Sequence, residues 1–170
     1  MTETLKGKKI LIVDDEPDVL ETLGDLLDMC VIDFAPDFKT AERLLKEKSY
    51  DAAILDIMGV KGYDLLELAK ARALPALMLT AHALSPDHLV KSIKGGAYSY
   101  IPKVEMIDIA SYLEEVIQAK SKGDRKPTKW FRKLSPLFDK KFGSDWRTQH
   151  KEVLREFDLT HTREDLEKIL

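Results

Sequence analysis

Short apolar runs recur at regular intervals along the first 120 residues. They cover residues 8–13 (KKILIV), 30–35 (CVIDFA), 51–55 (DAAIL), 75–79 (PALML) and 98–101 (YSYI). Their apolar positions do not alternate strictly with polar ones, which is typical of strands buried on both faces of a parallel sheet. The pattern therefore predicts a five-stranded parallel sheet.

A stretch with helical periodicity follows each apolar run. The predicted helices cover residues 14–29, 38–48, 63–72, 85–96 and 105–120. Asp37 is placed to cap the second helix, and Ser85 with Pro86 starts the fourth. Strands that alternate with helices through short connections predict a doubly wound α/β fold, with helices on both faces of the sheet.

Polar residues stand where the predicted strands end. The first strand is followed by Asp14, Asp15 and Glu16, the third by Asp56 and the fourth by Thr80, while the fifth strand leads to Lys103. Ligands of open parallel sheets bind outside the carboxyl ends of the strands. A hard divalent cation such as Mg²⁺ would relieve the repulsion among the carboxylates. A carboxylate can also attack phosphorus and form an aspartyl phosphate.

Each of these residues has an ordinary structural explanation when it is taken alone. An acidic pair stabilises a helix N-terminus, a lysine is usually solvated, and threonine is common at the end of a strand. These explanations do not predict that the residues gather at the ends of four different strands. We therefore favour one shared site.

Four segments carry a family resemblance: ILIVDDEPDVLETL, YDAAILDIM, ALMLTAHA and GGAYSYIPK. These four segments occur in the same order, and with nearly the same spacing, as in a known family. Through them, residues 6–120 resemble the receiver domain of two-component response regulators, which belongs to the CheY-like superfamily. The resemblance implies a flavodoxin-like (βα)5 fold with strand order 2-1-3-4-5. It also implies Mg²⁺-dependent transfer of a phosphoryl group from a sensor histidine kinase or phosphotransfer protein, without a separate catalytic domain.

The resemblance implies a role for each residue of the site. Asp56 matches the phospho-accepting aspartate, and Thr80 and Lys103 match the hydroxyl and the lysine that sense the phosphoryl group. Tyr100 matches the aromatic switch position, whose ring turns inward when the threonine moves.

The resemblance also implies a set of metal ligands. Asp14 and Asp15 match the acidic pair that binds Mg²⁺ together with Asp56. Met58, two residues after Asp56, matches the position whose backbone carbonyl binds the metal.

Two loops depart from the family pattern. The segment DIMGVKGYDLL is about two residues shorter than usual, lacks a proline and reaches Gly62 six residues after Asp56. Proline commonly follows the family's lysine, whereas here Pro102 precedes Lys103. The first departure bears on kinase docking and metal geometry, and the second on the rigidity of the last loop.

The rest of the chain differs in composition. We expect a receiver domain over residues 1–120, a linker over 121–128 and a helical C-terminal extension over 129–170. The extension holds both tryptophans and four of the six phenylalanines, and Ser135–Pro136 and Gly143 divide it into two or three short helices. Because large aromatic side chains are costly to leave in water, we expect four of them to pack on the receiver or on a second copy: Trp130, Phe131, Phe138 and Trp146.

Charge limits the partners of the extension. Residues 121–170 carry 13 Lys and Arg against 9 Asp and Glu, while residues 1–120 carry 14 against 21. Because the basic residues are interleaved with acidic ones, we do not expect DNA binding. The main expectation is that phosphorylation switches a surface that binds a downstream protein target. In the alternative, the extension itself provides the output, by dimerisation or by DNA binding.

Other classes of protein fit the sequence less well. A flavodoxin-like binder of flavin or nucleotide would need a glycine-rich loop after the first strand, and a haloacid-dehalogenase-type hydrolase would need its DxDx(T/V) motif there. No apolar run approaches the roughly 20 residues of a membrane span, and the N-terminus lacks a signal-peptide pattern. We therefore expect a cytoplasmic protein that does not enter a membrane.

Overall fold

Five parallel strands form the centre of the fold in the computed structural model, which describes residues 2–123 and 126–155. The strands are β1 (Lys9–Val13), β2 (Val31–Ala35), β3 (Ala52–Asp56), β4 (Ala76–Thr80) and β5 (Ser99–Pro102). Their order in the sheet is β2-β1-β3-β4-β5, as the family resemblance implied. Every residue of β3, β4 and β5 is buried, which explains the absence of polar alternation.

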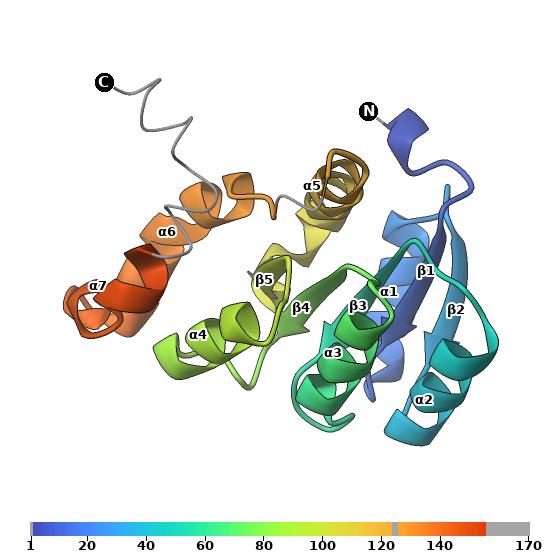
Figure 1. The fold of residues 1–170 in the computed structure, drawn as a ribbon, viewed down its shortest axis with the longest axis horizontal. Helices are drawn as coiled ribbons and strands as arrows, with labels where there is room; N and C mark the ends of the chain where they lie inside the picture. The colour runs from blue at the N-terminus through green and yellow to red at the C-terminus, as the bar shows by residue number, and fades with distance from the viewer. Residues whose placement is uncertain (1, 124–125, 156–170) are drawn as a thin grey trace.

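Helices cover both faces of this sheet (Figure 1). They are α1 (Pro17–Leu26), α2 (Phe38–Glu47), α3 (Gly62–Ala71), α4 (Pro86–Lys94) and α5 (Ile109–Ser121), preceded by a short 3-10 helix, η1 (Thr2–Thr4). Both predicted caps are confirmed. The side chain of Asp37 accepts the N–H of Thr40, and that of Ser85 accepts the N–H of His88.

The register of the sheet brings the predicted site residues to one edge. Asp56 pairs with Leu79, and Thr80 pairs with Pro102, the residue before Lys103. Neighbouring parallel strands therefore end nearly in step. This register places the last residues of β3, β4 and β5 next to one another at the carboxyl edge.

The helix that was predicted to begin at residue 105 begins four residues later. A 3-10 helix, η2 (Lys103–Asp108), precedes α5, which begins only at Ile109. The apolar residue Ile107 contributed to the predicted helix, but its side chain faces solvent. The buried stripe begins at Ile109, so packing supports the α-helix only from that residue onward.

The C-terminal extension lies beside β5, at the edge of the sheet (Figure 1). It forms α6 (Lys129–Phe142) and α7 (Trp146–Gln149), and residues 151–155 are also helical. The predicted break at Ser135–Pro136 was wrong, because α6 runs through Pro136. Proline removes one backbone donor, and buried residues on both sides of it hold the helix in place.

The four aromatic residues of the extension that were predicted to be buried are buried within the chain. The side chains of Trp130, Phe138 and Trp146 are at most 1% exposed, and that of Phe131 is 8% exposed. Residues 156–170 of the predicted extension lie outside the described residues. Among the described residues, none of the helices is long and apolar enough to cross a membrane.

The aromatic cluster of the extension predicts a local loss of stability in Phe131→Ala. The ring of Phe131 lies against those of Trp130, Phe138 and Trp146. Because buried Phe→Ala substitutions cost about 3–5 kcal/mol, the extension should undock at lower urea concentration. Both tryptophans lie in the extension, so the red shift of their emission measures this. Lys140→Ala, at an exposed position of α6, should leave the transition unchanged. A wild-type midpoint in Phe131→Ala would contradict the packing.

Candidate functional site

The ammonium group of Lys103 lies among three carboxylates at the carboxyl edge of the sheet. Its Nζ atom is 2.8 Å from Oδ2 of Asp14, 3.0 Å from Oε1 of Glu16 and 3.6 Å from Oδ1 of Asp56. The side chains of Lys103, Asp14 and Asp56 are buried, whereas that of Glu16 is exposed. One positive charge thus joins residues from the ends of β1, β3 and β5.

This arrangement leaves Asp56 short of positive charge. The pKa of Asp56 is raised to about 7, chiefly by burial and then by the charge of Asp14, while Lys103 acts in the opposite direction. Burial also raises the pKa of Asp14, although its contact with Lys103 acts in the opposite direction. Asp56 therefore holds its proton at a pH where an exposed carboxylate is fully ionised.

Glu16 belongs to the site although the sequence did not single it out as a site residue. Its hydrogen bond with Lys103 lowers the pKa of Glu16. The same bond and the bond with Asp14 raise the pKa of Lys103, against the effect of burial. The only sequence signal for Glu16 was its place directly after Asp14 and Asp15.

The carboxylates offer a set of oxygen donors that fits Mg²⁺. Oxygen atoms of Asp14, Asp15 and Glu16 all lie within 4.8 Å of one another. Asp56 joins this group through its shared contact with Lys103. Met58, the remaining predicted ligand, lies in the loop after Asp56 with its side chain about half exposed. Hard oxygen donors from the acidic cluster, with the buried carboxylate of Asp56 close by, suit Mg²⁺.

The shortened loop between β3 and α3 lies directly against the acidic residues. Gly59 has a φ of +86°, and a Cβ atom there would lie 2.4 Å from Oδ2 of Asp15. A Cβ atom at Gly62 would lie 2.1 Å from the backbone oxygen of Asp56. Two glycines thus let the loop pass close to Asp15 and Asp56.

Thr80 and Tyr100 meet at the loop between β4 and α4. The Oγ1 atom of Thr80 accepts the N–H of Ala83 at 2.9 Å. The hydroxyl of Tyr100 donates to the carbonyl oxygen of Ala83 and accepts the N–H of Ser85. Both side chains are fully buried, and burial raises the pKa of Tyr100. The predicted switch residue therefore points inward and holds the loop that also binds Thr80.

Residues 10–114 match the family model for the response regulator receiver domain. The chain belongs to this family. The receiver domain is a phosphoacceptor module of two-component signalling, and the fold, the strand order and the set of polar residues at the carboxyl edge agree with that assignment.

Known regulatory proteins are similar to part of this chain. The two-component response regulator ARR10 of Arabidopsis thaliana is 32% identical over 123 residues, which are 68% of this chain and 22% of the relative. The transcriptional regulatory protein CpxR of Klebsiella pneumoniae is 38% identical over 100 residues, 56% of this chain and 42% of the relative. The chain therefore spans less than half the length of these relatives.

A solved structure agrees with the fold. The crystal structure of a CheY-like response regulator receiver domain protein from Methanospirillum hungatei has a TM-score of 0.63 and 27% identity. The match covers 69% of this chain and 98% of that protein.

The raised pKa of Asp56 predicts that the metal-free protein loses stability as pH rises. Between the unfolded value of 3.8 and about 7, the folded chain keeps a proton that the unfolded chain releases. At pH 8 the folded wild-type chain bears the free-energy cost of a buried, ionised Asp56. Asp56→Asn has no carboxylate there, so it should be more stable than wild type at pH 8 by roughly 2–4 kcal/mol. Urea unfolding from pH 4 to 8 in EDTA measures the difference. A difference between the two proteins that does not change with pH would contradict the prediction.

Proposed function

We propose that this receiver domain accepts a phosphoryl group on Asp56 from a sensor histidine kinase or a phosphotransfer protein. The observation that carries the proposal is the position of Asp56, a buried carboxylate with the ammonium of Lys103 at 3.6 Å and an acidic cluster beside it. A buried group with a strongly raised pKa at the carboxyl edge of such a sheet is a candidate for function.

In the proposed reaction, a carboxylate oxygen of Asp56 attacks the phosphorus of a phosphohistidine. The new O–P bond replaces the N–P bond, and the departing imidazole takes up a proton from solvent. Because only the ionised carboxylate is nucleophilic, Asp56 has to lose its proton first. A cation beside Asp56 would favour that ionised form.

Two residues can bind the transferred group. Lys103 can turn from the carboxylates to the phosphoryl oxygens, since a charge-assisted hydrogen bond to phosphate is strong. Thr80 accepts the N–H of Ala83 through its oxygen, which leaves its own hydroxyl hydrogen for donation.

Asp14, Asp15, Asp56 and the backbone carbonyl of Met58 are the proposed ligands of Mg²⁺. Bound Mg²⁺ would neutralise charge on the phosphoryl oxygens. Glu16 adds a further oxygen within reach of the acidic pair. The domain then acts as a phosphorylation-controlled switch, with slow loss of the phosphoryl group and no separate catalytic domain.

The surface around the site has apolar side chains for a protein donor. Met58 is 48% exposed, Val104 75% and Ile107 77%, and Val104 directly follows Lys103. Met58 lies two residues after Asp56, so two of these side chains stand next to residues of the site in the sequence. A phosphohistidine that reaches Asp56 would bring its own protein surface against these residues.

Acetyl phosphate tests the phosphoacceptor role without a protein donor. We expect label on Asp56 in the presence of Mg²⁺ and none in EDTA, because the ionised carboxylate and the phosphoryl charge both need a cation. Mass spectrometry of the intact chain and its peptides measures the label. Asp56→Asn should take up none, whereas Asp25→Asn, at an exposed carboxylate of α1, should be labelled like wild type. Equal labelling of Asp56→Asn would refute the assignment.

The proposed role of Lys103 predicts that Lys103→Met separates metal binding from phosphoryl recognition. The ammonium of Lys103 competes with a metal for Asp14 and Asp56, so Mg²⁺ affinity should be unchanged or higher. Labelling by acetyl phosphate should slow, because the cation for the phosphoryl oxygens is lost. Calorimetric titration with Mg²⁺ and labelling rates measure the two effects, with exposed Lys61→Met as the control. Loss of Mg²⁺ binding in Lys103→Met would show a different role.

A further inference from the structure

A continuous series of contacts joins the site to α6 of the C-terminal extension. Thr80 accepts the N–H of Ala83, and the carbonyl oxygen of Ala83 accepts the hydroxyl of Tyr100. The ring of Tyr100 in turn lies 6.0 Å, centroid to centroid, from the ring of Phe138 on α6. Ala83 thus connects the predicted phosphoryl-sensing threonine to the residue that the extension covers.

Phe138 closes the interior over Tyr100. Both side chains are fully buried. The ring of Phe138 is itself backed by the rings of Phe131, Phe142 and Trp146. An outward turn of the Tyr100 ring would need space that Phe138 fills, and packed interiors leave little room for such overlap. The docked position of α6 and the inward position of Tyr100 therefore depend on each other.

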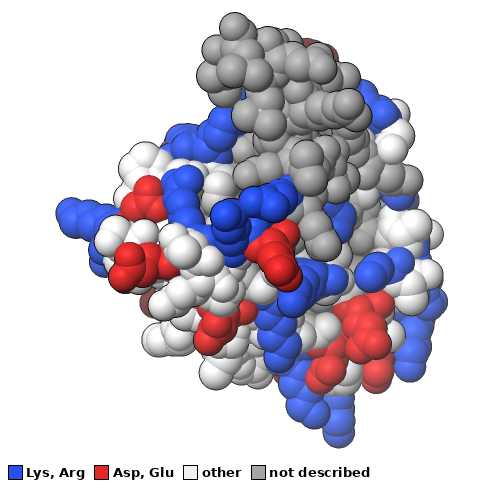
Figure 2. Space-filling model, turned by 60° about the vertical axis from the view of Figure 1, so that its left-hand side comes forward, with Lys and Arg blue, Asp and Glu red and all other residues white. Residues whose placement is uncertain are grey.

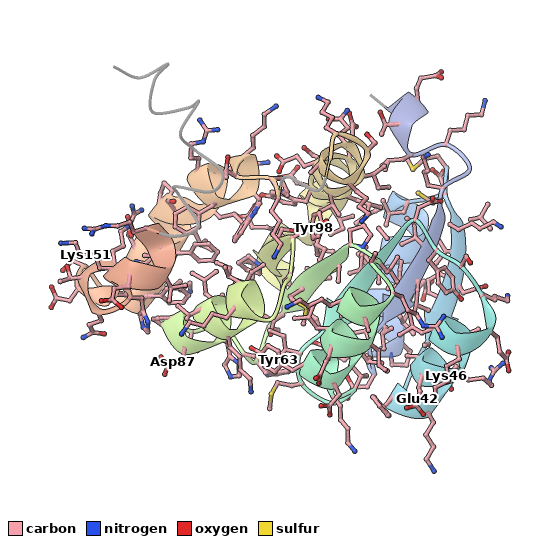
Figure 3. The ribbon with its side chains drawn as sticks, viewed as in Figure 1. Glu42, Lys46, Tyr63, Asp87, Tyr98 and Lys151 are labelled. Atoms are coloured by element: carbon pink, nitrogen blue, oxygen red, sulfur yellow. The ribbon has the colours of Figure 1, made fainter. Side chains whose placement is uncertain are left out.

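Polar contacts fix where the extension sits on the receiver. Three of them join it to α5, η2 and α4: the Glu115 carboxylate accepts the backbone N–H of Trp130, Lys133 lies 3.1 Å from Asp108, and His150 lies 3.6 Å from Asp87. Figure 3 shows Asp87 at the end of α4 that faces the extension. Because exposed ion pairs contribute little energy, these contacts set the position of α6, while the aromatic cluster provides most of its stability.

The free face of the extension is polar. Residues 126–155 carry nine Lys and Arg against three Asp and Glu. Figure 2 shows basic side chains, with acidic ones among them, on the face where α6 and α7 lie. The buried aromatic residues of α6 and α7 thus pack against residues of the same chain, and the surface that α6 and α7 leave to solvent carries charged side chains.

We propose that α6 acts as a built-in ligand of the receiver switch: by holding Tyr100 inward, it favours phosphorylation of Asp56. Tyr100 fixes the loop that binds the oxygen of Thr80, so the hydroxyl hydrogen of Thr80 remains free to meet a phosphoryl oxygen. The inference rests on the proposed function of Asp56. Because coupling between two sites is reciprocal, phosphorylation of Asp56 should also tighten the docking of α6.

The test compares two Phe→Ala substitutions on α6 in the full chain. Phe138 touches Tyr100, whereas Phe142 packs on Phe138 and Trp146. The first measurement is the affinity for beryllofluoride, a phosphoryl mimic, in the presence of Mg²⁺. The second is amide hydrogen exchange over residues 83–85 without beryllofluoride. If Phe138→Ala does not fold, Phe138→Leu provides a milder change at the same contact.

We expect Phe138→Ala to bind beryllofluoride about fivefold or more weakly than wild type. It should also exchange the loop amides faster, because Tyr100 is no longer held, and Phe142→Ala should stay close to wild type in both measurements. Wild-type affinity in Phe138→Ala, or an equal loss in both variants, would overturn the coupling and leave the phosphoacceptor role intact. A wild-type chain that binds no beryllofluoride would instead overturn the proposed function.

Discussion

The ammonium group of Lys103 is the positive charge around which the site is organised. It lies within 3.6 Å of carboxylate oxygens from Asp14, Glu16 and Asp56, and Asp15 stands directly beside them. Burial, together with the negative charges of Asp14 and Asp15 that one cation does not balance, raises the pKa of Asp56 to about 7. This excess of negative charge favours the binding of a divalent cation. Lys103 is also already in place to contact the oxygens of a phosphoryl group. Both properties follow from the same excess of negative charge.

The fold keeps these charges together in spite of their repulsion. Asp14 follows the buried run Ile10–Val13, and Asp56 is the last residue of a fully buried strand. Apolar burial of the strands is a large favourable term in folding, and each carboxylate is fixed to the end of a strand that cannot shift. Gly59 and Gly62 allow the next loop to close over the acidic residues. Repulsion at the edge is therefore balanced by packing in the core.

The site could be predicted largely from the sequence, because apolar runs show where strands end and parallel strands end together. Asp14, Asp56 and Lys103 meet as expected. Glu16 was placed at the end of the first strand but was given no role in the site, because an acidic residue before Pro17 is equally suited to the start of a helix. The start of the last receiver helix, at Ile109, was misjudged because Ile107 is apolar but exposed. Periodicity predicted that α6 buries one face. It could not show that this face meets β5, since amphipathicity does not identify the partner surface.

The distribution of charge along the chain acts in the same direction as the contacts beneath α6. Residues 1–120 carry 21 acidic and 14 basic side chains, and residues 126–155 carry three and nine. An acyl phosphate on Asp56 would add close to two negative charges to the acidic part and so strengthen its attraction for the basic extension. Salt screens such attraction beyond about 8 Å, so it acts as a weak, general contribution. The specific contribution has to pass through packed groups, and the path from Thr80 through Ala83 and Tyr100 to Phe138 consists of buried residues. The extension is thus better understood as part of the receiver's switch than as a separate output module tethered to it.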